Sequence, residues 1–169
     1  MPDALPLPPA CGKGAACAPL QHVRSEGTVI AFDFGEKRIG VAIGETLLGQ
    51  AHPLAVIRAE SKEARHTAIA KLVAEWQPAQ LVVGLPTHAD GTPHVLTERC
   101  RRFAASLERR YQVPVALADE RYTSLEAEGR LRETGRNAKS MKPLLDAVAA
   151  QLILQSWFDT HAPTNHAPA

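Results

Sequence analysis

Asp33 places a carboxylate inside an apolar run, TVIAFDF at 28–34. The run is β-branched and aromatic, and it is continuous rather than alternating, as in a strand that is covered on both faces. A carboxylate in such a strand is costly unless it is paired, hydrogen-bonded or bound to a metal. Two interpretations are open here: Asp33 serves a functional site, or it lies at the strand end and caps the turn at Gly35.

Asp146 is a second acid in an apolar pattern. It falls on the stripe that Ala150, Ile153 and Trp157 would form on the last helix of the chain. A place in the first turn of that helix would explain Asp146 by a favourable interaction with the helix N-terminus. That explanation accounts for an acid in the first turn but not for its place on the apolar face of the helix, so we favour a functional role for Asp146.

A third acidic group, Asp119-Glu120-Arg121, directly follows the last predicted strand. Acids at the carboxyl end of a parallel strand point into the crevice where such sheets hold their sites. Because side chains alternate along a strand, Asp119 and Glu120 must point to opposite sides, and at most one of them faces a given site. A solvated charged turn is the structural alternative for this triplet.

Carboxylates from these three segments could converge on divalent metal ions. Oxygen ligands suit Mg²⁺ or Mn²⁺, whereas the seven histidines are scattered and no His/Cys cluster suggests zinc. Two ions held by shared carboxylates would activate a water molecule and stabilise the leaving oxygen in the hydrolysis of a phosphodiester.

A basic segment is consistent with a phosphate-containing substrate. Residues 99–142 contain eleven Lys/Arg and six Asp/Glu, a net +5 in a chain whose total is +1. Such a field attracts phosphates, although an ordinary solvated helix face is the alternative. Aromatic residues make up only 5% of the chain, so stacking on bases is not expected to dominate binding.

The elements that must position these residues alternate between strands and helices. The pattern predicts three strands in an antiparallel meander and two later strands joined by helical crossovers; these strands cover 28–34, 39–43, 51–57, 81–85 and 113–118. Ser61 caps a helix that stops before Pro78, and a second helix carries an apolar stripe ending at Tyr111. A short helix begins at 123–126, and the final helix has Pro143 in its first turn. The fold class is therefore α/β with a mixed five-stranded sheet flanked by helices.

Length and composition indicate one globular domain. The 169 residues are 45% hydrophobic and 22% charged, and no apolar run is long enough for a membrane helix. Prolines and glycines without periodicity mark 1–26 as a disordered extension and 161–169 as a flexible tail, which leaves 27–160 as the folded unit. Three cysteines without a secretory signal favour the cytoplasm.

Four segments together resemble the YqgF family, also called RuvX. They are AFDFGEKRIGVAIG at 31–44, VVGLPTHADGT at 82–92, ADERYTSLEAE at 118–128 and LLDAVAAQLILQ at 144–155, all in the order of the family. The resemblance implies a ribonuclease H-like fold, similar to that of RuvC resolvases. It also implies a role in processing the 5′ end of the small-subunit ribosomal RNA precursor.

By that resemblance, Asp33, Glu120 and Asp146 are the catalytic acids and the ligands of two divalent metals. The resemblance and the basic segment together assign nucleic-acid contacts to eight residues: Lys37, Arg38, Arg121, Thr123, Ser124, Arg136, Lys139 and Lys142. Lys139 and Lys142 lie in KSMKPLL, where the family's lysine-rich loop is thinned.

The residues and the resemblance together predict a cytoplasmic, metal-dependent nuclease that is a monomer or homodimer. Its role in ribosome maturation and its substrate, precursor ribosomal RNA, are what the resemblance implies. A Holliday junction resolvase acting on branched DNA is the nearest alternative and would favour a symmetric dimer. A non-catalytic RNA-binding assembly factor and an ATPase of the actin/Hsp70 type are alternatives of other classes. The latter needs two lobes, and about 130 folded residues supply one.

Overall fold

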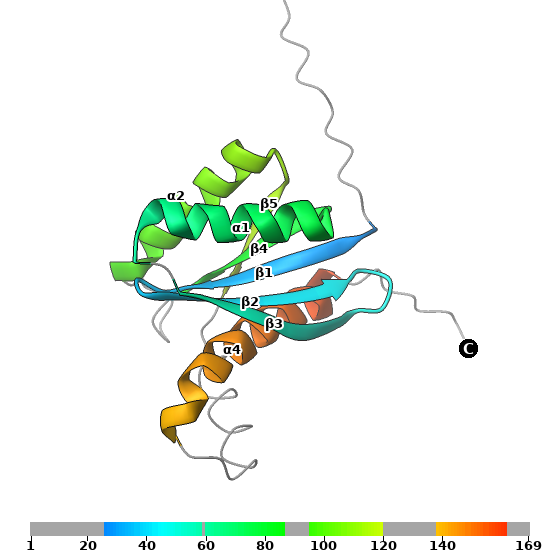
Figure 1. The fold of residues 1–169 in the computed structure, drawn as a ribbon. Helices are drawn as coiled ribbons and strands as arrows, with labels where there is room; N and C mark the ends of the chain where they lie inside the picture. The colour runs from blue at the N-terminus through cyan, green and yellow to red at the C-terminus, as the bar shows by residue number, and fades with distance from the viewer. Residues whose placement is uncertain (1–25, 59, 87–94, 120–137, 162–169) are drawn as a thin grey trace, which may run out of the picture.

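Five strands form one mixed sheet in the order β3-β2-β1-β4-β5 (Figure 1). The computed structural model describes residues 26–58, 60–86, 95–119 and 138–161, and of residues 138–143 only the main chain. The strands are β1 (Thr28–Phe34), β2 (Arg38–Glu45), β3 (Gln50–Arg58), β4 (Gln80–Leu85) and β5 (Val115–Asp119). β1, β2 and β3 pair antiparallel, whereas β4 and β5 run parallel to β1. The α/β class and the mixed sheet are thereby confirmed.

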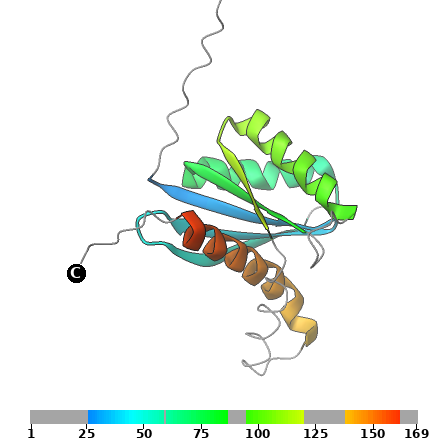
Figure 2. The same ribbon diagram turned by 180° about the vertical axis from the view of Figure 1, so that it is seen from behind.

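In the described part of the chain, three helices cover the two faces of this sheet. α1 (Lys62–Trp76) and α2 (Val95–Tyr111) lie on one face, and α4 (Ala138–His161) crosses the other, as the two views show (Figures 1 and 2). Ser61 caps α1 as predicted, because its hydroxyl accepts a hydrogen bond from the Ala64 amide at 3.1 Å.

The alternation of side chains along β1 builds a core on each face. Ile30 and Phe32 pack toward α1 and α2, in a cluster that includes Leu107 of α2. Val29 and Ala31 pack toward α4. The sheet is therefore covered on both sides, which explains why the sequence of β1 is continuously apolar.

The final helix begins earlier than the sequence predicted. α4 starts at Ala138, so Pro143 lies in the second turn rather than the first. Proline lacks the N–H that would bond to the carbonyl four residues back, which is why a first-turn place was expected. Asp146 is consequently the ninth residue of the helix. The effect of the helix N-terminus fades within the first turn, so it does not account for this acid.

Within the described residues, no helix is both long and apolar enough to cross a membrane. The short helix predicted at 123–126, like the segments 1–25 and 162–169, lies outside the described residues. β5 starts two residues later than predicted, after Pro114, whose carbonyl accepts a hydrogen bond from the Leu81 amide at 2.9 Å.

Candidate active site

Asp33 lies within the sheet, on the face that α4 covers. It pairs across the ladder with Gly40 of β2, so it belongs to the strand and not to the following turn. Val29 and Ala31, four and two residues before it, belong to the core on the α4 side. Because side chains alternate along a strand, Asp33 points toward the same side.

Gly40 is the reason that α4 can bring Asp146 to this place. A Cβ atom at Gly40 would overlap the main-chain carbonyl of Asp146. The missing side chain therefore lets the helix backbone rest directly on β2. Since Gly40 is the cross-strand partner of Asp33, the close approach also sets Asp146 beside Asp33.

The two acids influence each other's protonation. Burial, and after it the negative charge of Asp146, raises the pKa of Asp33 to about 6. Burial also raises the pKa of Asp146, whereas the positive charges of Arg38 and Arg58 act to lower it. Ionisation of both acids is disfavoured in the metal-free protein, as for any like-charged pair removed from water.

Arg38 faces Asp146 from the start of β2. Its Nε lies 3.1 Å from Asp146 Oδ2, and the two side chains are 32% and 28% exposed. The contact is an ion pair, but its geometry is not that of a hydrogen bond. The buried Oδ2 therefore has no hydrogen-bond partner in the described part of the chain. Arg58, the cross-strand partner of Arg38, adds a second positive charge near Asp146.

The chemistry of this pair fits a divalent cation. Both donors are carboxylate oxygens, which Mg²⁺ and Mn²⁺ prefer. A cation here would lower the pKa of Asp33, and it could take the buried Oδ2 of Asp146, which accepts no hydrogen bond from the described residues, as a ligand. No group of three or more His, Cys, Asp or Glu able to hold a metal occurs among the described residues. Glu120, the third acid of the prediction, lies outside them.

β5 ends at the same edge of the sheet as β1, the strand that carries Asp33. Ala116 and Ala118 pack on the α4 side, whereas Val115 packs toward α1 and α2. Alternation therefore assigns Asp119 to the face away from Asp33. Glu120 lies outside the described residues, so the expectation that at most one acid of the Asp119-Glu120 pair faces the site stays a prediction.

The predicted nucleic-acid contacts are only partly described. Lys37 is exposed in the turn between β1 and β2, and Arg38 is half-buried against Asp146. Arg121, Thr123, Ser124 and Arg136 lie outside the described residues. Lys139 and Lys142 belong to the first turns of α4, where only the main chain is described.

Sequence reasoning missed two residues that shape the site. Gly40 could have been found, because a glycine inside a strand often marks a close backbone approach. Arg58 carried no local signal. Its influence on Asp146 depends on the pairing of β2 with β3 and on the position of α4.

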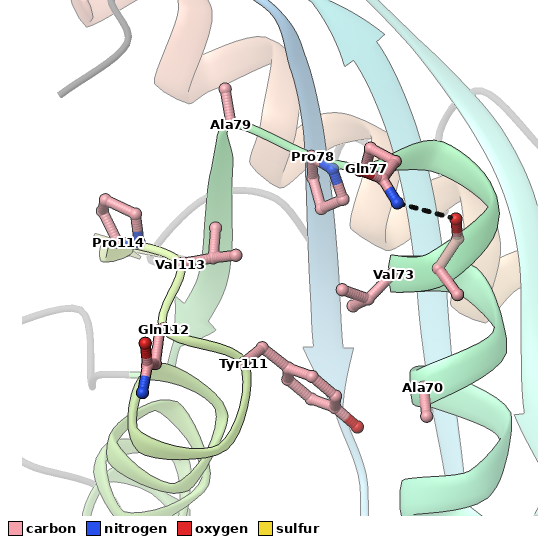
Figure 3. Close-up of a pocket in the computed structure, with 10 residues that line it drawn as sticks. Ala70, Val73, Gln77, Pro78, Ala79, Tyr111, Gln112, Val113 and Pro114 are labelled. Atoms are coloured by element: carbon pink, nitrogen blue, oxygen red, sulfur yellow. Dashed lines mark hydrogen bonds between the residues drawn. The ribbon is translucent and has the colours of Figure 1, made fainter. Parts of the chain in front are cut away.

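A separate cavity of about 640 Å³ lies between the C-terminal ends of α1 and α2. Figure 3 shows that Val73, Pro78 and Val113 line it, with Tyr111 between the two helices. The Tyr111 hydroxyl donates a hydrogen bond to the His66 carbonyl at 3.2 Å, so it serves packing. The described residues that line this cavity include no carboxylate, and the cavity lies at the opposite end of the helices from Asp33, so the acidic pair remains the candidate site.

Comparison with known proteins agrees with the motifs. Residues 27–160 match the model of the family RuvX, described as "Holliday junction resolvase". A protein of Dechloromonas aromatica named "Putative pre-16S rRNA nuclease" is 72% identical over 134 residues, which span 79% of this chain and 92% of that protein. A relative of the same name from Methylobacillus flagellatus is 57% identical over 141 residues, or 83% of this chain and 97% of that protein.

Among solved structures, the fold is similar to that of the fowlpox virus resolvase, which was determined in complex with Holliday junction DNA. The TM-score is 0.50 at 10% identity, and the match covers 79% of this chain and 97% of that one. At this identity the likeness concerns the fold alone, and it confirms the expected ribonuclease H-like architecture.

Proposed function

This chain belongs to the RuvX family, and from this premise we propose that it is a nuclease that hydrolyses phosphodiester bonds with the help of divalent metal ions. The observation that carries the proposal is the meeting of Asp33 and Asp146 on one face of the sheet. Two neighbouring acids that are largely removed from water oppose each other's ionisation, and such costs are typical of functional sites. The names of the relatives also refer to enzymes that act on nucleic acid.

We assign the metal site to Asp33 and Asp146, with Glu120 as the third acid. Bound Mg²⁺ or Mn²⁺ would supply a water of lowered pKa and a Lewis acid for the scissile phosphate. Asp33, with a pKa of about 6, loses its proton near neutral pH and then offers a full carboxylate. Arg38 favours the ionised form of Asp146 and restrains its side chain.

The cations around the pair would hold the substrate. Lys37 is exposed next to Arg38 at the carboxyl end of β1, where it can contact a backbone phosphate. In the proposal, Arg121, Thr123 and Ser124 add contacts beside Glu120. The basic residues Arg136, Lys139 and Lys142 precede Asp146 in the chain and would extend the phosphate-binding surface.

Precursor 16S ribosomal RNA, cut near its 5′ end during ribosome biogenesis in the cytoplasm, is the substrate that we propose. The names of the relatives support this choice. A four-way DNA junction is the second candidate, and the description of the family supports it. Resolution of a junction requires two cuts, so it would call for a homodimer, whereas a monomer suffices for trimming RNA.

The test compares three substrates under three conditions. The purified protein is incubated with precursor ribosomal RNA, a four-way DNA junction and an unstructured RNA, each with Mg²⁺, Mn²⁺ or EDTA. We expect metal-dependent cleavage of the precursor RNA and none in EDTA. Selective cleavage of the junction would make the DNA resolvase the correct function. Binding of RNA without cleavage in any metal would indicate a non-catalytic assembly factor.

A further inference from the structure

A second basic surface lies on the other face of the sheet. An open groove of about 710 Å³ runs between α1 and α2. We define this α1–α2 groove by its four cations, which are Lys62, Arg65, Arg99 and Arg102. We propose that the α1–α2 groove binds backbone phosphates of the nucleic-acid substrate, outside the acidic site. The proposal rests on the proposed function only in taking nucleic acid as the ligand.

The cations of the groove exceed its acids. Among the described residues that line it, the carboxylates are Glu36 and Glu60. Glu36 pairs with Arg99, and their side chains are 60% and 54% exposed. Exposed pairs of this kind contribute little, so a phosphate can replace the carboxylate on the guanidinium. The groove therefore keeps a positive field that suits a phosphate chain.

Two cations have no carboxylate partner within the described residues. Lys62 and Arg65 form no ion pair there, although both are at the N-terminal end of α1. Arg102 pairs with Glu98 at 3.4 Å, but both side chains are largely exposed. The groove thus offers one lysine and one arginine from α1, and two arginines from α2 whose partners are in contact with solvent.

Arg65 is already held in place for binding. Its Nη2 donates a hydrogen bond to the Glu36 carbonyl at 2.7 Å, and its guanidinium lies 5.3 Å from the centre of the Phe34 ring. Phe34 in turn packs on Phe103 of α2, with ring centres 4.8 Å apart. A side chain that is fixed before binding loses less conformational entropy when a ligand arrives.

The groove adjoins the acidic site through the turn between β1 and β2. Glu36 lies in this turn, and it contacts Arg65 of α1 through its carbonyl and Arg99 of α2 through its carboxylate. Arg38, two residues later, contacts Asp146 on the other face. A nucleic-acid strand that passes over this turn would therefore meet both the groove and the acidic pair, each on its own face of the sheet.

The experiment compares two double variants with the same loss of charge. Lys62→Gln with Arg102→Gln removes two groove cations, one from each helix. Lys71→Gln with Arg109→Gln removes one lysine of α1 and one arginine of α2 outside the groove lining. All four side chains are exposed, so both variants should fold, which thermal melting would verify. Binding of a labelled single-stranded RNA is followed by fluorescence anisotropy in EDTA over a series of salt concentrations.

We expect the groove variant to bind RNA roughly 25-fold more weakly at about 0.1 M salt, with a salt slope smaller by about 1.4, because two phosphate contacts on a single strand are lost. The control variant should stay close to the unmodified protein. Equal losses of RNA affinity in both variants would show that the overall positive charge, not the groove, attracts RNA, and would overturn the proposal. An unchanged salt slope in the groove variant would overturn it as well. Inorganic pyrophosphate should compete with RNA for the groove and lower the anisotropy of the labelled RNA. Pyrophosphate that occupies the groove without displacing any RNA would also overturn the proposal.

Cleavage is measured separately in Mn²⁺ with saturating RNA, so that the two proposals can fail independently. A groove variant that binds weakly but cleaves at saturation supports the groove as a binding site apart from the acids. Absence of cleavage in every variant would overturn the nuclease proposal while the anisotropy result still decides the groove. Absence of RNA binding by the unmodified protein would overturn both.

Discussion

Gly40 of β2 lies directly beneath the main-chain carbonyl of Asp146 in α4, and no side chain fits between them. The same glycine is the ladder partner of Asp33. One residue without a side chain thus fixes the distance at which the helix crosses the sheet, and with it the proximity of the two acids.

Gly40→Ala should separate the acids. The added methyl group must displace the backbone of α4, and overpacking of this kind costs roughly 1–3 kcal/mol of the free energy of unfolding. As α4 moves away, the pKa of Asp33 should fall from about 6, because burial and the charge of Asp146 both decrease. Chemical denaturation gives the stability, and titration of Asp33 by NMR gives the pKa.

Gly49→Ala is the control for a loss of stability without an effect on the site. Gly49 has a φ of +61°, and an added Cβ atom would meet nothing within 4 Å. A non-glycine residue in this conformation costs about 1–2 kcal/mol. An equal change in the pKa of Asp33 in both variants would contradict the role of Gly40 at the site.

Asp146→Asn should abolish or strongly reduce cleavage and leave RNA binding largely intact. In EDTA the variant should be as stable as the unmodified protein or slightly more so, because it removes a partly buried negative charge next to Asp33. Mn²⁺ should raise the melting temperature of the unmodified protein by mass action, and that of the variant less. Thermal melts in EDTA and in Mn²⁺ give both comparisons.

Asp159→Asn on the same helix is the matched control, since Asp159 is exposed and accepts a hydrogen bond from Gln155 at 3.1 Å. It should keep the full shift in melting temperature that Mn²⁺ produces. If Asp146→Asn kept that shift as well, or still cleaved at full rate, Asp146 would not be a metal ligand.

The stability of the metal-free protein should fall as the pH rises from about 4 to about 6. Asp33 has a pKa of about 6 in the folded chain and an ordinary value of 3.8 when unfolded, so the folded state binds more protons in this interval. The loss is at most about 3 kcal/mol, and less where solvent screens the charge. Denaturant unfolding in EDTA at several pH values measures it.

Asp33→Asn should remove most of this pH dependence between about pH 4 and 6. The amide does not titrate, so its variant should be the more stable protein above about pH 6. A variant with the same pH profile as the unmodified protein would show that Asp33 is not the group responsible.

Arg38→Gln should raise the pKa of Asp146 further, because Arg38 is the nearest cation that favours its ionised form. More Mn²⁺ should then be needed for half-maximal cleavage, and the need should be greater at low pH, where protons compete for the carboxylate. Arg58→Gln should act in the same direction but less strongly, since the influence of Arg58 on Asp146 is second to that of Arg38. Cleavage rates over a range of Mn²⁺ concentrations at two pH values would rank the two; a larger effect for Arg58→Gln would contradict this order.

Reversal of Arg136 and Lys139 to Glu should weaken RNA binding at low salt and flatten its salt dependence, because fewer counterions are released. Lys71→Glu with Arg109→Glu is the control with equal charge reversal. Anisotropy titrations at several salt concentrations measure both slopes. An unchanged slope in the first variant would remove Arg136 and Lys139 from the proposed binding surface.

The sequence alone determined the elements that the structure describes and their order. The run at 28–34 predicted β1 with its final bounds, and Ser61 predicted the start of α1, because apolar periodicity and capping are local properties. The misfit of Asp33 and Asp146 with their apolar surroundings singled out both acids. The predicted start of α4 was wrong. The prediction relied on the preference of proline for the first turn of a helix, whereas Pro143 lies in the second turn.

Only the tertiary structure decided how the acids meet. The pairing of Asp33 with Gly40, the backbone of α4 on that glycine, and the ion pair of Arg38 with Asp146 join residues far apart in the chain. The same holds for the α1–α2 groove, whose cations come from two helices and converge around Glu36. Such contacts depend on the packing of whole elements. Their effect on a pKa depends on burial, which cannot be read from a local pattern of residues.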